Sequence, residues 1–341
     1  MRAAVYRKEI GGLRVEELPE PTLGPGEVRV RVRYASICGS DLFLIRSGQL
    51  PDGAILGHEM SGQVDALGKG VKGFSMGQGV IVRPIGCGRC APCSRGEENL
   101  CPERLAIGLG ALPGAFAEAI VVPSGMLIPV PEGLELSAAA LAEPLATALH
   151  GIRLAGIGTG QRVLVLGAGG IGLCAVAMLR ALAVEDILVW EPQEGRRRRA
   201  LSLGASRAVD PLTEDLEEAV FSWRAGEDLE AAIECAGSLE ALRQAMELVS
   251  PGGKIVLIGL AKGKMDWAPA VTMLKQLRIQ GSYSNTRMEC RLCLEMLSQG
   301  RLGVREMVEG ILALEDLPGK IRSLLHSPGD GKVLVEVGSD W

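Results

Sequence analysis

The stretch of sequence that decides the fold is VLVLGAGGIG, which runs from Val163 to Gly172. Four apolar residues, typical of a buried strand, lead directly into a glycine-rich turn with the spacing G-x-G-x-x-G, and a helix-like stretch follows. The first glycine permits a tight turn, the second lets backbone amides approach a pyrophosphate, and the third lets the helix pack closely on the sheet. The pattern predicts a dinucleotide site whose phosphate-binding residues are Gly167, Gly169, Gly170, Ile171 and Gly172.

Strand and helix patterns alternate around this turn and stop near residue 285. Helical stretches include residues 171–183 and 239–248. We predict strands over residues 162–166, 186–190, 207–209, 229–235, 253–258 and 279–282. Such an alternation indicates a parallel sheet with helices on both faces. The sequence thus predicts a doubly wound α/β domain over residues 148–285.

The rest of the chain has the patterns of β structure. Residues 27–34 alternate polar and apolar side chains, as a strand with one solvated face does, and short apolar runs occupy residues 79–82 and 119–122. Another strand pattern, over residues 332–337, follows the α/β region, so we expect the chain to return to the first domain. The sequence predicts an irregular, barrel-like β domain formed by residues 1–147 and 286–341.

Composition excludes several classes of protein. The chain has 341 residues, enough for two domains, and 47% of them are hydrophobic, enough for a packed core. The net charge of −5 gives no basic surface for nucleic acid. The chain contains no run of about 18 apolar residues, so no membrane span is expected. The N-terminal stretch MRAAVY resembles a strand rather than a signal peptide. We expect a cytoplasmic protein that binds neither nucleic acid nor membrane.

Two features bear on which dinucleotide binds. Glu191 ends the second strand of the α/β domain, nineteen residues after Gly172. A carboxylate there accepts hydrogen bonds from the adenosine ribose hydroxyls and repels a 2′-phosphate, which favours NAD. The run Arg196–Arg199 could hold a 2′-phosphate instead, or it could be the solvated start of a helix. The sequence therefore favours NAD over NADP.

Four of the nine cysteines lie within fifteen residues, at Cys87, Cys90, Cys93 and Cys101. Four thiolates in a loop rich in Gly and Pro suit a tetrahedral zinc ion with no open coordination position. An iron–sulfur cluster also takes four cysteines, but nothing nearby points to electron transfer. We predict a structural zinc that holds together a lobe over residues 86–102, which has too few apolar residues to form a core.

A second set of ligand types is scattered, at Cys38, His58 and Glu143. A lone cysteine is usually a small core residue, and a lone His–Glu pair usually lies at the surface. Yet the chain has only three histidines, and His58 lies in a glycine-flanked turn of the β domain.

The other cysteine and histidine candidates are weaker. Cys290 and Cys293 form a C-x-x-C pair in the helix-like stretch 287–297, where packing is favoured over a redox role. His150 is expected to be structural, and His326 has no supporting neighbours.

Together these residues resemble the zinc-containing medium-chain dehydrogenase/reductase family, and most closely its sorbitol and threonine dehydrogenase branch. The resemblance covers nearly the whole chain. It implies a GroES-like catalytic β-barrel and a Rossmann cofactor domain, assembled into a homodimer or homotetramer through a strand near residues 278–282. It depends on CGSD at 38–41, GHE at 57–59, EPL at 143–145, ECAG at 234–237, the four-cysteine lobe and the glycine-rich turn.

The resemblance also implies roles for single residues. Cys38 and His58 would bind a catalytic zinc, and either Glu59 or Glu143 would complete the site, since relatives use both positions. Asp41 would orient His58, and Ser40 would receive the alcohol proton. The cofactor would contact, besides the glycine-rich turn, Glu191, Arg196, Cys235, Ile258, Gly259, Leu260, Ser282, Tyr283 and Ser284.

The chain departs from many relatives at Phe43, where they carry a histidine that takes part in the proton relay. Its absence leaves Ser40 and the nicotinamide ribose to pass the proton. Phe43 would instead line a more apolar substrate pocket.

The implied function is hydride transfer between NAD(H) and a secondary alcohol or polyol, with one catalytic and one structural zinc. A first rival is a zinc-free reductase of the quinone reductase type, against which Cys38, His58 and the four-cysteine lobe argue. A second rival is a protein that binds zinc and cofactor without catalysis, against which the intact ligand set argues.

Overall fold

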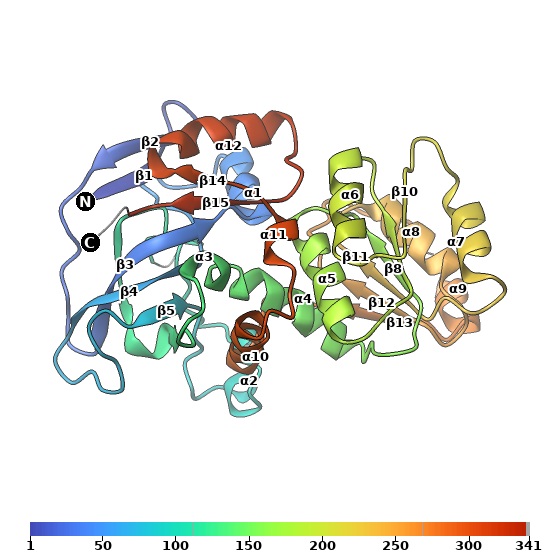
Figure 1. The fold of residues 1–341 in the computed structure, drawn as a ribbon, viewed down its shortest axis with the longest axis horizontal. Helices are drawn as coiled ribbons and strands as arrows, with labels where there is room; N and C mark the ends of the chain where they lie inside the picture. Colours follow the sequence, from blue (N-terminus) through green and yellow to red (C-terminus); the bar gives the residue numbers. More distant parts are fainter. Residues whose placement is uncertain (111, 268, 339–341) are drawn as a thin grey trace. The chain divides into compact units, whose positions relative to one another are not determined.

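The structure, a computed structural model, describes residues 1–110, 112–267 and 269–338. It divides into two compact units (Figure 1). The first comprises Met1–Glu143, Thr286–Gly300 and the chain from Val308 onward, and the second comprises Pro144–Asn285 and Arg301–Met307. Residues 301–307 belong to the second unit because Arg301 donates to the Ala181 carbonyl at 2.8 Å, and Arg199 donates to the Glu306 carbonyl at 2.9 Å.

The second unit is built on a parallel sheet of six strands, in the order β10-β9-β8-β11-β12-β13. The strands are β8 (Val163–Leu166), β9 (Ile187–Trp190), β10 (Arg207–Val209), β11 (Ala231–Glu234), β12 (Lys254–Leu257) and β13 (Arg278–Gly281). This confirms the six predicted strands. From β8 the strands are added outward to β10 on one side and from β11 outward to β13 on the other, so the strand order reverses between β8 and β11, which is where doubly wound sheets bind dinucleotides.

Helices cover this sheet, and in Figure 1 α5 and α6 lie to one side of the strands while α8 and α9 lie to the other. Leu164, Leu188 and Ala232 of the strands pack with Val220 and Ala245 of α7 and α8 in one core cluster. The four inner strands β9, β8, β11 and β12 are largely buried on both faces, as their apolar sequences require, whereas the edge strand β13 is mostly exposed. The helices are α4 (Ala142–Leu154), α5 (Gly170–Ala181), α6 (Glu194–Ser202), α7 (Leu216–Arg224), α8 (Leu239–Leu248), α9 (Pro269–Leu274) and α11 (Val304–Met307).

The first unit is an irregular, mainly antiparallel β structure. Its long strand β3 (Glu27–Ser36) pairs along one edge with β4 (Glu59–Leu67). Along the other edge it pairs with β6 (Ala119–Pro123) in its first half and with β15 (Lys332–Glu336) in its second half. The predicted return of the C-terminal strand to this domain is therefore confirmed, as are the predicted strands at 27–34, 79–82 and 119–122.

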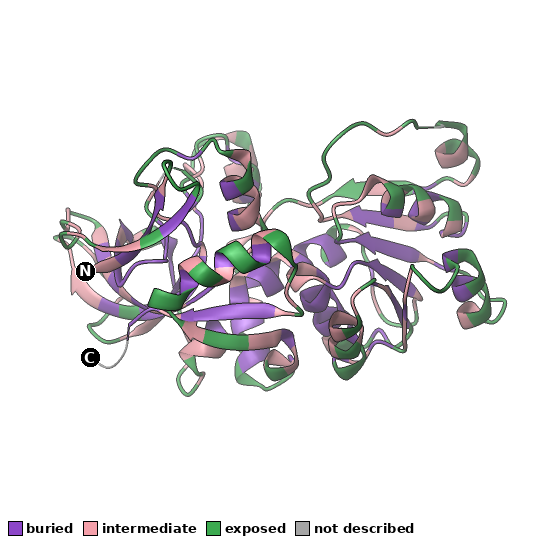
Figure 2. Ribbon diagram, turned by 90° about the horizontal axis from the view of Figure 1, so that it is seen from above, coloured by how far each residue is buried: buried purple, intermediate pink, exposed green. Residues whose placement is uncertain are grey.

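The other strands of this unit are β1 (Arg2–Arg7), β2 (Gly12–Glu17), β5 (Gly79–Val82), β7 (Leu127–Pro129) and β14 (Val308–Ala313). Its helices are α1 (Gly39–Ser47), α2 (Ala91–Ser94), α3 (Leu136–Ala139), α10 (Arg287–Ser298) and α12 (Leu317–His326), with 3₁₀ turns η1 (Glu98–Leu100), η2 (Ser124–Met126) and η3 (Leu314–Asp316). In both units the strands are largely buried and the helices carry exposed faces (Figure 2).

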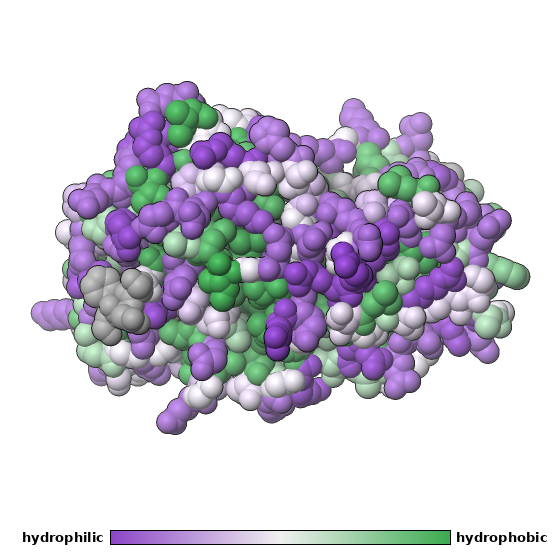
Figure 3. Space-filling view, turned by 45° about the horizontal axis from the view of Figure 1, so that its top comes forward, coloured by the Kyte–Doolittle hydropathy of each residue, from purple (hydrophilic) through white to green (hydrophobic). Residues whose placement is uncertain are grey.

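Helix α10 confirms the predicted helical stretch around Cys290 and Cys293. Both thiols are fully buried and neither forms a disulfide, which agrees with a packing role. Within the described ranges, none of the helices has the length and apolar character needed to cross a membrane. Hydrophilic side chains cover most of the face drawn in Figure 3, and hydrophobic ones lie between them in separate groups.

Candidate functional site

Three of the scattered ligand candidates come together in the first unit. Cys38 immediately precedes α1, His58 immediately precedes β4, and Glu59 is the first residue of β4. The thiol, an imidazole nitrogen and a carboxylate oxygen all lie within 4.8 Å of one another, a spacing that suits one metal ion. Among the described residues, Glu143 is not a member of this group.

Asp41 holds the two segments that carry Cys38 and His58. Its carboxylate is fully buried and accepts a hydrogen bond from the Cys38 N–H at 2.9 Å and from the Gly57 N–H at 3.2 Å. Its Oδ1 also lies 3.6 Å from His58 Nδ1. Because an acid three residues into a helix commonly bonds back to the residue before it, the helix start itself presents Asp41 to the site.

The turn before β4 directs His58 toward Cys38, and this turn requires glycine at position 57. Gly57 has a φ of 91°, in the region that side chains disfavour, and a Cβ there would lie 2.8 Å from the Phe116 ring. The packing of this turn against Phe116 therefore leaves no room for a side chain at position 57.

The electrostatics of this group favour a cation. Burial lowers the pKa of His58, but the Cys38 thiolate and the Asp41 carboxylate outweigh it and raise the pKa well above its usual value. Ser40 Oγ lies 3.3 Å from His58 Nε2, at hydrogen-bonding distance. Phe43, half-buried, occupies the same helix one turn further on.

The sequence did not indicate the partner of Glu59. Lys332, the first residue of β15, donates to Glu59 Oε2 at 2.5 Å and to the Ile37 carbonyl at 3.0 Å. The Lys332 side chain is 4% exposed and the Glu59 side chain 1%, so this is a buried ion pair. The C-terminal strand thus supplies a charge to the carboxylate that lies beside Cys38 and His58.

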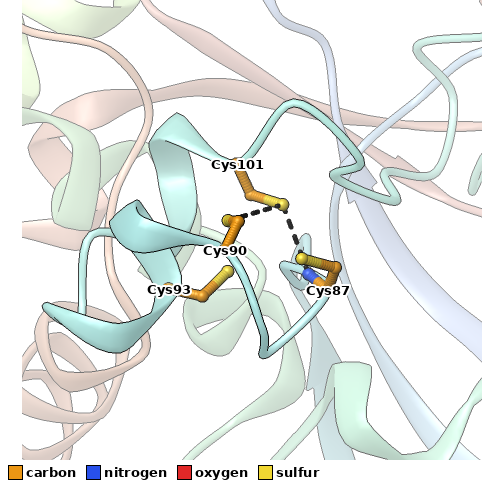
Figure 4. Close-up of side chains that lie close together, drawn as sticks. All are labelled: Cys87, Cys90, Cys93 and Cys101. Atoms are coloured by element: carbon orange, nitrogen blue, oxygen red, sulfur yellow. Dashed lines mark hydrogen bonds between the residues drawn. The ribbon is translucent and has the colours of Figure 1, made fainter.

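The four clustered cysteines converge in a lobe of the first unit, with their sulfur atoms directed toward a common centre (Figure 4). Cys90 Sγ lies 3.7 Å from Cys101 Sγ, which also accepts from the Cys87 N–H at 3.3 Å. The backbone N–H of Arg89 lowers the pKa of Cys87 to about 7. Four thiolates this close repel one another unless a cation lies between them, so the donor set fits zinc.

Glu98 ties this lobe to the rest of its unit, a role that the sequence also did not indicate. Its Oε1 pairs with Arg83 Nη1 at 2.5 Å and accepts from the Arg287 N–H at 3.1 Å. Arg83 is 1% exposed, and Arg287 donates further to the Gly125 and Leu127 carbonyls.

In the second unit, the predicted cofactor residues lie at the carboxyl ends of the parallel strands or in the first turn of the helices α5 and α6 that follow them. The glycine-rich turn joins β8 to the N-terminus of α5, where helical N–H groups favour an anion. A Cβ on Gly172 would lie 2.0 Å from the Gly167 carbonyl oxygen, so the close helix packing needs glycine there. This turn therefore has the shape that a pyrophosphate requires.

Glu191 follows β9, and its side chain is hydrogen-bonded to this turn. It is buried, and its two carboxylate oxygens accept from the Ala168 N–H at 2.7 Å and the Gln193 N–H at 3.0 Å. Arg196 Nη1 lies 3.6 Å from the same carboxylate. Of the other arginines in the run, Arg197 donates to the Glu191 and Pro192 carbonyls, and Arg198 is largely exposed.

The remaining predicted cofactor residues follow β11, β12 and β13. Cys235 is buried at the end of β11, and Ile258–Leu260 follow β12. After β13, Ser282 Oγ is buried without a hydrogen-bond partner among the described residues, and Ser284 has a φ of 58°. A buried hydroxyl that lacks a partner and a strained backbone are features of a ligand site, so this end of the sheet fits a bound nucleotide.

Comparison with known proteins identifies the family. Residues 24–132 match the alcohol dehydrogenase GroES-like domain, and residues 170–299 match the zinc-binding dehydrogenase domain. Sorbitol dehydrogenase from Arabidopsis thaliana is 32% identical over 89% of this chain and 86% of its own. An alcohol dehydrogenase from Thermus sp. ATN1 superimposes with a TM-score of 0.92 at 32% identity, covering 99% of this chain and 100% of that one.

A protein from Sinorhizobium meliloti 1021, solved with NADP bound, superimposes with a TM-score of 0.89 at 31% identity, covering 98% of this chain and 99% of that one. The matched domains agree with the β unit and the doubly wound unit described above. The chain therefore belongs to the zinc-containing medium-chain dehydrogenase/reductase family of alcohol dehydrogenases and is an oxidoreductase of that family.

Proposed function

We propose that Cys38, His58 and Glu59 bind the catalytic zinc ion of this dehydrogenase, and that the second unit binds the dinucleotide. The observation that carries the proposal is the convergence of these three donors within 4.8 Å, held by the single buried carboxylate of Asp41. Of the two carboxylates left open by the sequence, the geometry supports Glu59, whose carboxylate lies within 4.8 Å of the Cys38 and His58 donors.

The reaction we infer is the oxidation of an alcohol to a carbonyl compound and its reverse. When bound, zinc supplies the Lewis acidity that lowers the pKa of an alcohol hydroxyl, and nicotinamide accepts the hydride. Asp41 faces His58 Nδ1, so Nε2, which lies 3.3 Å from Ser40 Oγ, would be the nitrogen that holds zinc. Ser40 takes the alcohol proton onward, because Phe43 offers no titratable group.

We propose a secondary alcohol or polyol as the substrate, in a protein that acts in the cytoplasm. Sorbitol and xylulose, on which relatives are named to act, give the first compounds to test. Initial rates across secondary alcohols and polyols, with NAD and NADP in parallel, test the proposal. No turnover of any compound by protein with a full zinc content would contradict it.

We propose that NAD is the preferred cofactor because the Glu191 carboxylate closes over the glycine-rich turn. Although one relative binds NADP, a 2′-phosphate here would lie against a buried acid. We expect kcat/KM with NAD to exceed that with NADP by about 100-fold, since a like-charge contact costs several kcal/mol. Glu191→Gln, which keeps an acceptor but removes the charge, is expected to narrow this ratio to about tenfold.

The matched control for Glu191→Gln is Arg198→Ala, which should leave the ratio unchanged because Arg198 is 72% exposed. Arg196, 3.6 Å from Glu191, provides the opposite test. A wild-type preference for NADP that Arg196→Ala abolishes would assign the site to NADP instead.

We propose that Cys87, Cys90, Cys93 and Cys101 bind a second, structural zinc ion. Cys101→Ser is expected to remove that zinc and to lower the melting temperature by about 10 °C, the shift for a loss of about 3–5 kcal/mol in a domain of this size. Metal analysis and calorimetry measure both effects. Iron in place of zinc, with visible absorption, would support the cluster reading instead.

We propose that the protein assembles as a homodimer or homotetramer through its second unit. Strand β13 pairs only with β12, so one edge of the six-stranded sheet has no neighbouring strand among the described residues. An edge of this kind can extend its sheet with the same strand of a second copy. We also propose that the first unit is the catalytic domain and the second the cofactor domain.

A further inference from the structure

Glu234 is a buried acid that the reaction proposed above does not use. It is the last residue of β11, at the carboxyl end of the strand next to the glycine-rich turn, and it is 2% exposed. Within the described part of the chain, its carboxylate forms no ion pair with an Arg, Lys or His side chain. A buried carboxylate without a cationic partner is costly and needs an explanation.

The Glu234 carboxylate is bound by backbone instead. Oε1 accepts from the Ser238 N–H at 3.1 Å, and the N–H groups of Ala236 and Gly237 also interact with the carboxylate. Burial raises the pKa of Glu234, and these three donors counter the effect because they favour the charged form. The side chain thus shapes the turn between β11 and α8.

This turn contacts the two neighbouring loops, which also lie at the carboxyl end of the sheet. A Cβ on Gly167, in the glycine-rich turn, would lie 2.9 Å from the Ala236 nitrogen. On the other side, a Cβ on Gly259 would lie 2.5 Å from Glu234 Oε2 and 2.3 Å from the Gly237 nitrogen. Glu234 therefore lies where the loops after β8, β11 and β12 meet.

The topology places this meeting point on the nicotinamide side of the proposed dinucleotide site. Glu191, at the end of β9, marks the adenosine side, and the pyrophosphate belongs at the start of α5. The other half of a dinucleotide then extends over the ends of β11, β12 and β13. Oxidised nicotinamide carries a positive charge on its ring and reduced nicotinamide does not.

We propose that Glu234 is a positioning residue of the dinucleotide site, and that its buried carboxylate makes the protein favour oxidised over reduced nicotinamide. The inference rests on the proposed dinucleotide site. The turn needs a hydrogen-bond acceptor at this position, and a neutral amide would provide one. The negative charge is the additional feature, and it stabilises only the oxidised ring.

The test measures dissociation constants for NAD⁺ and NADH by calorimetry on the zinc-loaded enzyme and its Glu234→Gln variant. Glutamine keeps the shape and an acceptor oxygen, so we expect the variant to fold. We expect it to lose affinity for NAD⁺ relative to NADH by roughly fivefold, as the attraction between a buried charge and the ring disappears. Glu234→Asp, which keeps the charge, should restore most of the wild-type ratio.

The matched control is Glu230→Gln. Glu230 directly precedes β11, at the amino end of the strands, and accepts a hydrogen bond from the Arg162 N–H at 2.8 Å. The same substitution there should change neither dissociation constant. An unchanged ratio in Glu234→Gln, or equal weakening of both ligands, would overturn the inference. Failure of the wild-type enzyme to bind either ligand would instead count against the proposed dinucleotide site.

Discussion

Replacement of Cys38 by serine is expected to lower kcat by about 1000-fold, because a Lewis acid at the substrate oxygen contributes several kcal/mol to the barrier. Cys38 is one of three donors that converge within 4.8 Å, and its backbone is fixed by Asp41. Serine keeps that backbone bond but is a poor zinc ligand. The affinity for NADH should remain within about twofold, since the variant leaves the glycine-rich turn intact.

Three measurements on one preparation separate the possible outcomes. Zinc analysis should fall from two ions per chain to one, because the four-cysteine lobe is untouched. The control is Cys293→Ala, which removes a buried thiol of the same unit that belongs to neither donor set, and it should retain both metals and most of the turnover. Wild-type turnover by a Cys38→Ser protein with one zinc per chain would exclude the proposed catalytic role.

The parts of the fold predicted from sequence are those with local physical causes. Gly172 follows from how closely a helix can approach its own turn, Gly167 from a φ of 90° that side chains disfavour, and the inner sheet strands from continuous apolar runs. The four-cysteine lobe is equally local, since fifteen residues contain every donor. Each of these patterns carries its explanation within a single segment.

The donor set at Cys38, His58 and Glu59 is different, because no segment contains it. Only a family resemblance assembled these residues from the sequence, and it left open whether Glu59 or Glu143 belongs with them. One local signal was available: Asp41 stands three residues after Cys38, the spacing of an acid that bonds back to the start of a helix. That spacing identifies the helix start, but it does not identify Gly57, the second hydrogen-bond partner of the Asp41 carboxylate.

The ion pairs between residues far apart in the chain were not predicted from the sequence. Lys332 and Glu59 are 273 residues apart, and a lysine at the start of a strand ordinarily extends into solvent. The Glu98 contacts with Arg83 and Arg287 have the same character. Pairings of this kind depend on the register of strands that only the complete fold brings together, so local sequence patterns do not predict them.

Lys332→Met is expected to lower the free energy of unfolding by about 3–5 kcal/mol, because it leaves a buried carboxylate without its cation. Both side chains are at most 4% exposed, so water cannot replace the lost ammonium group. Methionine has similar length and suits a buried position, so packing should change little. Urea denaturation of the zinc-loaded enzyme measures the loss.

A surface pair and a double variant make this prediction specific to burial. Lys320 pairs with Glu309 at 2.5 Å, but both side chains are about one quarter exposed, so Lys320→Met should cost at most about 1 kcal/mol. In the metal-free protein, where Glu59 holds no zinc, combining Lys332→Met with Glu59→Gln removes both buried charges and should recover part of the stability, since neither is then left unpaired. Equal, small losses in Lys332→Met and Lys320→Met would mean that the Glu59 carboxylate is compensated by something other than Lys332. The bound zinc ion is then the remaining candidate for that compensating charge. The same comparison on metal-free protein would measure its contribution, because the stability loss in Lys332→Met should grow once the second positive charge is removed.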